Sequence, residues 1–147
     1  MRSLLAVLLL SLVGCSDDDS SGPDGDDFAN IDGSWTWAAD VSNSELQLSC
    51  LAAGSATINQ TGDQFNGTIT GSSGSCTGPE GTFPFDSDGP IGGGFVEGNS
   101  VSFDDNFCDY TGVATGNPIN EVDGEVTCVF PISGQDVTMV GTWEMQR

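Results

Sequence analysis

The chain has 147 residues and a mass of 15.1 kDa, which suffices for one domain and a short extra segment but not for a multidomain assembly. Its 22 acidic residues against 2 cationic ones give a net charge of -20, so it lacks the cations that neutralise phosphates, and nucleic acid is excluded as a partner. Histidine is absent, and Arg2 and Arg147 are the only cations, so His-based triads, lysine Schiff bases and arginine fingers are unavailable. We therefore predict that the protein is not an enzyme and uses no cofactor.

Residues 1–14 have the pattern of a secretory signal peptide, with a positively charged start followed by the apolar run Leu4–Val13. That run is about half as long as the ~20 residues of a membrane-spanning helix. The sequence LVGC that ends at Cys15 resembles the lipobox of bacterial lipoproteins. The resemblance implies cleavage after Gly14, a diacylglycerol on the Cys15 sulfur and a further acyl chain, such as palmitate, on its amine. Several acyl chains together give stable attachment to a membrane.

The residue after Cys15 bears on the membrane that holds the lipid. In lipoproteins of double-membrane bacteria, an Asp at this position favours retention at the inner membrane, whereas this chain has Ser16. The resemblance therefore implies the outer membrane of a bacterial cell envelope. Residues 16–27, SDDDSSGPDGDD, contain six Asp and no hydrophobic residue, so we predict that residues 15–27 are the lipidated cysteine and an acidic, disordered tether.

Residues 28–147 form the predicted domain, in which glycines separate short segments that alternate apolar and polar residues. Trp35 and Trp37 share one face of the segment 33–40, and the segments 55–60 and 65–70 repeat the period of two. Gly98-Asn99 predicts a hairpin between residues 95–97 and 100–104. A second hairpin is predicted between 110–115 and 122–130, and a last strand over 137–145.

These segments predict an all-β fold. About eight strands joined mostly to their sequence neighbours favour an antiparallel up-and-down meander that closes into a small barrel. The alternative is a two-sheet β-sandwich. Closure would also hide the edge strands.

Cys50, Cys76, Cys108 and Cys128 remain once Cys15 is assigned to lipid, and an even number in an exported domain predicts disulfides. Residues that face each other across a hairpin are centred on its turn. Cys50 and Cys76 are centred on the predicted turn 61–64, and Cys108 and Cys128 on the turn 117–120. We therefore predict a Cys50–Cys76 and a Cys108–Cys128 disulfide. A four-Cys zinc site is the competing interpretation, but no CxxC spacing supports it.

Two acidic segments were compared with calcium-binding loops. Asp86-Ser87-Asp88 with Glu97 has the length of an EF-hand loop, yet Pro90 and Ile91 replace an oxygen ligand and the required glycine. Asp104-Asp105-Asn106, close to Asp109, is a second oxygen-rich segment without ligand spacing. We interpret both as acidic loops and predict no metal site.

Most of the aromatic residues fall on the predicted inner faces of the strands. They either fill a core or line a ligand cavity, because an eight-stranded barrel is just wide enough for one or the other. The residues are Trp35, Trp37, Phe65, Phe95, Phe103, Phe130 and Trp143.

Gly33-Ser34-Trp35 at the start of the first strand, and Gly141-Thr142-Trp143 followed by Arg147 at the end, resemble the lipocalin and avidin group of barrels, the calycin type. In that group the tryptophan of a GxW motif closes the barrel floor and commonly packs against a basic residue from the last strand. The resemblance implies these roles for Trp35 and Arg147. It carries over no ligand-binding residue.

The function predicted from these features is that of a lipid-anchored envelope lipoprotein with a non-enzymatic β-barrel domain that binds a small apolar or amphipathic ligand. The membrane is a partner through the N-terminal lipid. The alternative is a packed-core structural or interaction module that binds another envelope protein. Ligand carriage predicts a cavity bounded by Trp35, Phe103 and Trp143, whereas an interaction module predicts a filled core and an exposed apolar patch.

Overall fold

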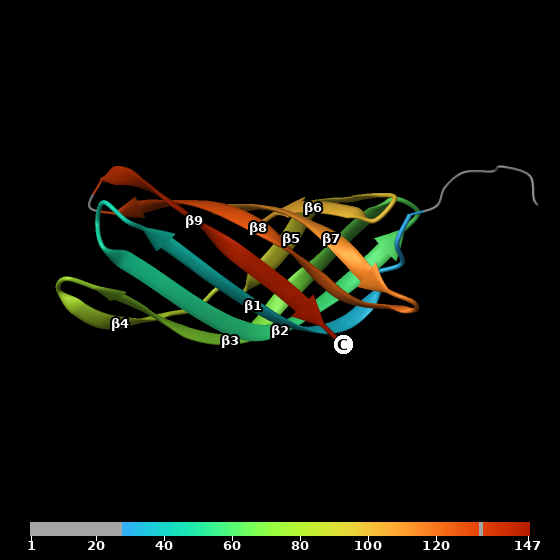
Figure 1. Cartoon of the computed structure of the whole chain (residues 1–147), viewed down its shortest axis with the longest axis horizontal. Helices are drawn as coiled ribbons and strands as arrows, with labels where there is room; N and C mark the ends of the chain where they lie inside the picture. The colour runs from blue at the N-terminus through green and yellow to red at the C-terminus, as the bar shows by residue number, and fades with distance from the viewer. Residues whose placement is uncertain (1–27, 133) are drawn as a thin grey trace, which may run out of the picture.

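The computed structural model describes residues 28–132 and 134–147 (Figure 1). The predicted signal peptide 1–14, the lipidation site Cys15 and the tether 15–27 lie outside the described residues. Within them the chain forms strands and no helix. The strands are β1 (Gly33–Asn43), β2 (Leu48–Thr61), β3 (Gln64–Gly78), β4 (Gly81–Phe85), β5 (Gly89–Glu97), β6 (Ser100–Asp104), β7 (Cys108–Gly116), β8 (Ile119–Ile132) and β9 (Gln135–Gln146).

All strand pairs are antiparallel, and eight strands close into a barrel in the order β1-β2-β3-β5-β6-β7-β8-β9. The ring closes because β1 pairs with β2 on one side and with β9, from Thr36 to Ser42, on the other. The remaining strand, β4, pairs with the last residues of β3. The predicted up-and-down barrel is thereby confirmed, and the two-sheet sandwich is wrong.

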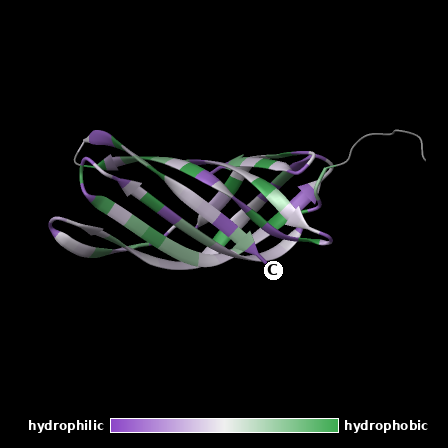
Figure 2. Ribbon diagram, viewed as in Figure 1, coloured by the Kyte–Doolittle hydropathy of each residue, from purple (hydrophilic) through white to green (hydrophobic). Residues whose placement is uncertain are grey.

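Alternation of apolar and polar residues explains why these segments form strands with one buried face. Along β1, Trp35, Trp37 and Val41 point inward and are buried, while Thr36 and Asp40 point outward. Figure 2 shows the same alternation as hydrophobic and hydrophilic bands along the other strands. Among the described residues every fully buried side chain is hydrophobic. The interior of the barrel is therefore the hydrophobic core.

Two inward-facing glycines make room for aromatic rings. A Cβ at Gly112 would lie 2.8 Å from Cζ2 of Trp143, and one at Gly94 would lie 2.5 Å from the ring of Phe65. Both distances are too short for a side chain, so a larger residue would displace the ring. The narrow interior thus accepts the rings of Trp143 and Phe65 because the inward positions beside them lack side chains.

One end of the barrel, here called the floor end, contains residues 28–32, the β2–β3, β5–β6 and β7–β8 turns and the C-terminus. Its interior is closed by Trp35, whose Nε1 donates a hydrogen bond to the carbonyl oxygen of Ile31 at 2.8 Å. The Arg147 guanidinium lies over the Trp35 ring, 4.0 Å from its centroid, and donates to the carbonyl oxygens of Asn30 and Asp32. This is the packing that the resemblance to calycin-type barrels implies.

The opposite end, here called the disulfide end, lies on the left of Figure 1 and contains the β1–β2, β3–β4 and β8–β9 turns. Cys50 and Cys76 are bonded between β2 and β3, and Cys108 and Cys128 between β7 and β8. These are the two predicted pairs, and in each the cysteines are directly opposite in the strand register. By restricting the unfolded chain, each contributes about 3 kcal/mol to stability.

The prediction that Phe95 faces inward is wrong, because its side chain is 40% exposed on the outer face. The pairing of Val96 with Val101 puts those two side chains inside, and Phe95 then lies beside Ser102 on the outside. A register shift between Gly92 and Phe95 changes which residues of β5 point inward from this point on. The inward position before Val96 is Gly94, where the Phe65 ring occupies the space.

Candidate functional site

The middle of the barrel is filled by aromatic side chains in mutual contact. The Phe103 ring stacks on Tyr110 with centroids 4.3 Å apart and meets Trp143 edge to face at 5.0 Å, and Phe65 approaches Phe103 at 5.9 Å. Trp37 and Trp143 are each 2% exposed. Of the predicted set, Trp35, Trp37, Phe65, Phe103 and Trp143 therefore belong to the core. Because Phe103 and Trp143 touch each other, the space expected between them is occupied.

The three tryptophans differ in how their indole N–H groups are satisfied. Trp35 donates to Ile31, and Trp143 donates to the carbonyl oxygen of Thr111 at 3.1 Å. Trp37 Nε1 is the one buried side-chain polar atom of the described region without a hydrogen-bond partner. Such a buried donor costs about 1–3 kcal/mol. Of the three indole N–H groups, only that of Trp37 is thus left without an acceptor in the interior.

The barrel wall is incomplete at the disulfide end. β4 pairs with β3 on one side and forms the edge of the sheet on the other, and β8 pairs with β7 only as far as Cys128. Beyond Cys128, the backbone N–H of Val129 donates a hydrogen bond to the carbonyl oxygen of Phe107. The rest of β8 pairs with β9 alone. The ring contact between Phe85 and Phe130 brings the two edges together. We call this gap, between β4 and residues 129–132 of β8, the seam.

A proline in each edge segment keeps the seam from closing as a sheet. Pro84 lies in β4, and Pro131 lies in the last residues of β8. Proline has no N–H to donate, so strands that contain it are poor partners for a further strand. Side chains, rather than backbone hydrogen bonds, therefore fill the seam.

A cleft of about 260 Å³ lies at the seam, and its lining residues include three phenylalanines and three aspartates. Phe130 is the central ring, with Phe85 at 5.9 Å and Phe107 at 5.7 Å between centroids. Phe107 is 51% exposed. The aspartates are Asp86, Asp88 and Asp105. The two acidic segments noted in the sequence, 86–88 and 104–106, thus reach one cleft.

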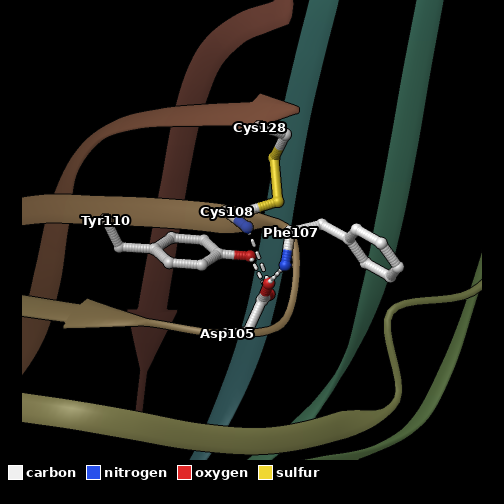
Figure 3. Close-up of a disulfide and its surroundings, with 5 residues drawn as sticks. All are labelled: Asp105, Phe107, Cys108, Tyr110 and Cys128. Carbon is white, nitrogen blue, oxygen red and sulfur yellow. Dashed lines mark hydrogen bonds between the residues drawn. A yellow bond between two sulfur atoms is a disulfide. The ribbon is translucent and has the colours of Figure 1, made fainter. Parts of the chain in front are cut away.

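Asp105 organises the β6–β7 loop beside the second disulfide (Figure 3). Its Oδ1 accepts hydrogen bonds from the backbone N–H groups of Phe107 and Cys108, each at 2.8 Å, and its Oδ2 accepts one from the Tyr110 hydroxyl at 2.9 Å. Burial, and then the negative charge of Asp105, raise the pKa of Tyr110 far above its ordinary value. Tyr110 therefore stays a neutral donor, and Asp105 holds Phe107 at the rim of the cleft.

Asp88 fixes the other side of the cleft by joining the bend before β5 to β3. Its carboxylate accepts hydrogen bonds from the backbone N–H groups of Ser72 at 2.7 Å and Gly71 at 3.1 Å. Hydrogen bonding from the side chain and backbone of Ser72, and from Gly71, holds the pKa of Asp88 below its ordinary value. Asp88 is therefore an anion at neutral pH.

Other hollows of the described region have a different character. One of about 560 Å³ lies on the outer wall and is lined mainly by outward-facing side chains such as Ala53, Ser73 and Thr142. Within the described residues no three His, Cys, Asp or Glu side chains are grouped so that they could hold a metal ion. The same residues include no helix with the length and apolarity of a membrane span.

Comparison with known proteins adds only distant structural similarity. No protein-family profile matches the chain, and no curated protein matches it. Among solved structures, the siderocalin Ex-FABP, described as functioning through dual ligand specificities, shares 14% identity over 77% of this chain and 68% of its own, with a TM-score of 0.31. An overlap of this quality transfers no ligand and no activity.

The strand order itself defines the class of protein. Eight antiparallel strands in up-and-down order, closed between the first and the last, form the architecture that lipocalins and streptavidin share. The fold is therefore a closed, eight-stranded up-and-down barrel of this architecture. Its candidate site is the seam cleft, which the sequence does not reveal, although prolines inside two strand-like segments are a signal of sheet edges.

Replacing Asp105 with Ala is expected to lower the free energy of unfolding by about 2–3 kcal/mol, because two backbone N–H groups and the Tyr110 hydroxyl lose a charged acceptor. Denaturant unfolding measures the change. The control is Asp109→Ala, at an exposed position nearby, which should change stability by at most about 0.5 kcal/mol. Equal effects of the two substitutions would contradict the assigned role of Asp105.

Proposed function

We propose that this protein is a lipid-anchored lipoprotein of the bacterial outer membrane whose barrel is not an enzyme and binds a small apolar or amphipathic ligand in the seam cleft. The observation that carries the proposal is the group of Phe85, Phe107 and Phe130 at a gap in the wall. Phe107 is half exposed there while the rings deeper in the barrel are packed. Exposed aromatic groups in a concave site are typical of ligand binding.

The position of the cleft supports this function for an anchored protein. The described chain begins at residue 28 at the floor end (Figure 1). The cleft lies toward the disulfide end, because its lining includes Cys108 and the seam residues Phe85 and Phe130. A lipid on Cys15 would therefore connect to the barrel at the end away from the cleft. The cleft would remain accessible to a ligand that arrives from the aqueous side.

The groups around the cleft favour binding over catalysis. Asp88 and Asp105 use both carboxylate oxygens to accept hydrogen bonds from neighbouring residues, so neither oxygen is left solely for proton transfer. The chain has no histidine or lysine that could activate a nucleophile. These features support a non-enzymatic site.

A second candidate function is a module that binds another envelope protein. It is favoured by exposed apolar side chains around the disulfide end, namely Leu46, Phe83, Val129 and Ile132, which are 47%, 49%, 42% and 40% exposed. A partner protein would cover these side chains together with the seam. The two functions differ in the mass of the bound species.

Intact mass measurement of the protein isolated from its own membrane tests ligand binding. Under gentle ionisation we expect a mass above that of residues 15–147 plus acyl chains, and on denaturation we expect the loss of one small-molecule increment. Substitution of Phe107 by Ala should reduce the bound fraction, because Phe107 lines the cleft. A bound species of protein size would instead favour the interaction module.

The lipid anchor is tested by replacing Cys15 with Ala, which removes the sulfur that the lipobox resemblance marks for lipidation. We expect unprocessed precursor with no acyl mass, since cleavage after Gly14 would depend on prior lipidation. Mass measurement of the membrane and soluble fractions gives the result. Normal processing at Gly14 together with retention at the membrane would show that the lipobox assignment is wrong.

A further inference from the structure

We propose that the ligand of the seam cleft is a small organic cation, an ammonium group attached to an apolar body. The proposal rests on the proposed small-ligand function of the cleft and deepens it by naming the ligand class. Two properties of the cleft carry it. Three aspartates without a cationic partner line it together with three phenylalanines, and hydrogen bonds from neutral groups hold the carboxylates of two of them, Asp88 and Asp105, in place.

The negative charge of the cleft is uncompensated. Asp86, Asp88 and Asp105 all line it. Arg147, the only cationic side chain after residue 2, is at the floor end, where it covers Trp35. Sixteen of the 22 acidic residues lie after residue 27, so the field around the cleft is negative throughout. A cation entering the cleft would be attracted by the charges of Asp86, Asp88 and Asp105, and an anion would be repelled.

The carboxylates are positioned before any ligand arrives. Asp105 accepts only backbone N–H groups and the neutral Tyr110 hydroxyl, and Asp88 is held by Ser72 and Gly71. Neutral donors orient a carboxylate without cancelling its charge. A ligand cation therefore gains attraction without having to order these side chains, which lowers the free-energy cost of binding. Asp86 is exposed on the same rim and adds a third charge.

The phenyl rings select a cation that carries apolar groups. The face of an aromatic ring attracts ammonium groups, and aromatic sites are used to recognise quaternary ammonium ligands. Phe107 and Phe130 both line the cleft, with their centroids 5.7 Å apart and their planes tilted by 39°. A volume of about 260 Å³ restricts the ligand to a small molecule.

A metal ion fits this cleft less well than an organic cation. No metal-binding group of three acidic, Cys or His side chains is present in the described part of the chain. Divalent ions prefer a shell of oxygen ligands, whereas three of the ten residues that line this cleft are phenylalanines. The acidic segment 16–27 of the same chain is an unsuitable occupant too, because its six Asp would be repelled.

Calorimetric titration of the purified full chain with three benzyl compounds tests the ligand class. The probes are benzyltrimethylammonium, N-benzylacetamide and phenylmethanesulfonate, which share an aromatic body and are cationic, neutral and anionic. We expect the cation to bind at least about 10-fold more tightly than the neutral probe, from cation–π and charge attraction together. The anion should show no binding. Raising the salt concentration should lower the affinity for the cationic probe and leave that for the neutral probe unchanged.

Two pairs of variants locate the binding in the cleft. Phe107→Ala should lower the affinity for benzyltrimethylammonium by about 5-fold or more, and Asp86→Asn should lower it by about 3-fold or more. Their controls are Phe95→Ala, at an exposed ring of the outer wall, and Asp63→Asn, in the β2–β3 turn at the floor end. Both controls should leave the affinity unchanged. Circular dichroism of each variant confirms that the barrel is folded.

The outcomes separate the ligand class from the function itself. Equal affinity for the cationic and neutral probes, both lost in Phe107→Ala, would overturn the cation proposal and leave ligand binding in the cleft intact. Binding of Ca²⁺ that displaces the organic cation and is lost in Asp86→Asn would replace the proposal by a metal site. Absence of binding by all three probes would contradict both the cation proposal and small-ligand binding at the seam.

Discussion

The first strand pairs along both of its sides, with β2 over its whole length and with β9 from Thr36 to Ser42. This double pairing turns an open meander into a ring and removes the two edges that an open sheet would expose. Closing only eight strands makes the interior narrow. Two of the large rings lie against inward glycines, Trp143 beside Gly112 and Phe65 beside Gly94, and the middle of the barrel becomes a packed core.

The two ends of this ring differ because the strands have unequal lengths. At the floor end Arg147 and residues 28–32 cover Trp35. At the disulfide end β6 is short, β5 is separated from β4 by a bend, and the seam remains between β4 and β8. The disulfides brace β2 to β3 and β7 to β8, the strand pairs on either side of the seam. The gap thus lies between two cross-linked hairpins and is a defined cleft.

Features that depend on neighbouring segments could be predicted from the sequence. The alternation of apolar and polar residues predicted the strands. Both disulfides could be predicted because each cysteine pair is centred on a turn and a hairpin is a local structure. The side on which Phe95 lies was mispredicted because one register shift reverses the alternation. The seam depends on three phenylalanines from β4, the β6–β7 loop and β8, and only closure of the whole ring brings them together. Pro84 and Pro131 mark its edges, yet a proline alone does not show which two edges face each other.

The central claim is that small ligands bind at the seam while the interior of the barrel remains packed. Nuclear magnetic resonance of the isotope-labelled full chain tests both parts in one titration with benzyltrimethylammonium. The account predicts that the backbone amide signals of Phe107 and Cys108 shift with added ligand, because these residues line the cleft. The indole N–H signals of Trp37 and Trp143, which lie in the core, should stay in place. Shifts of the two indole signals without a change at Phe107 would place the ligand inside the barrel and contradict the account.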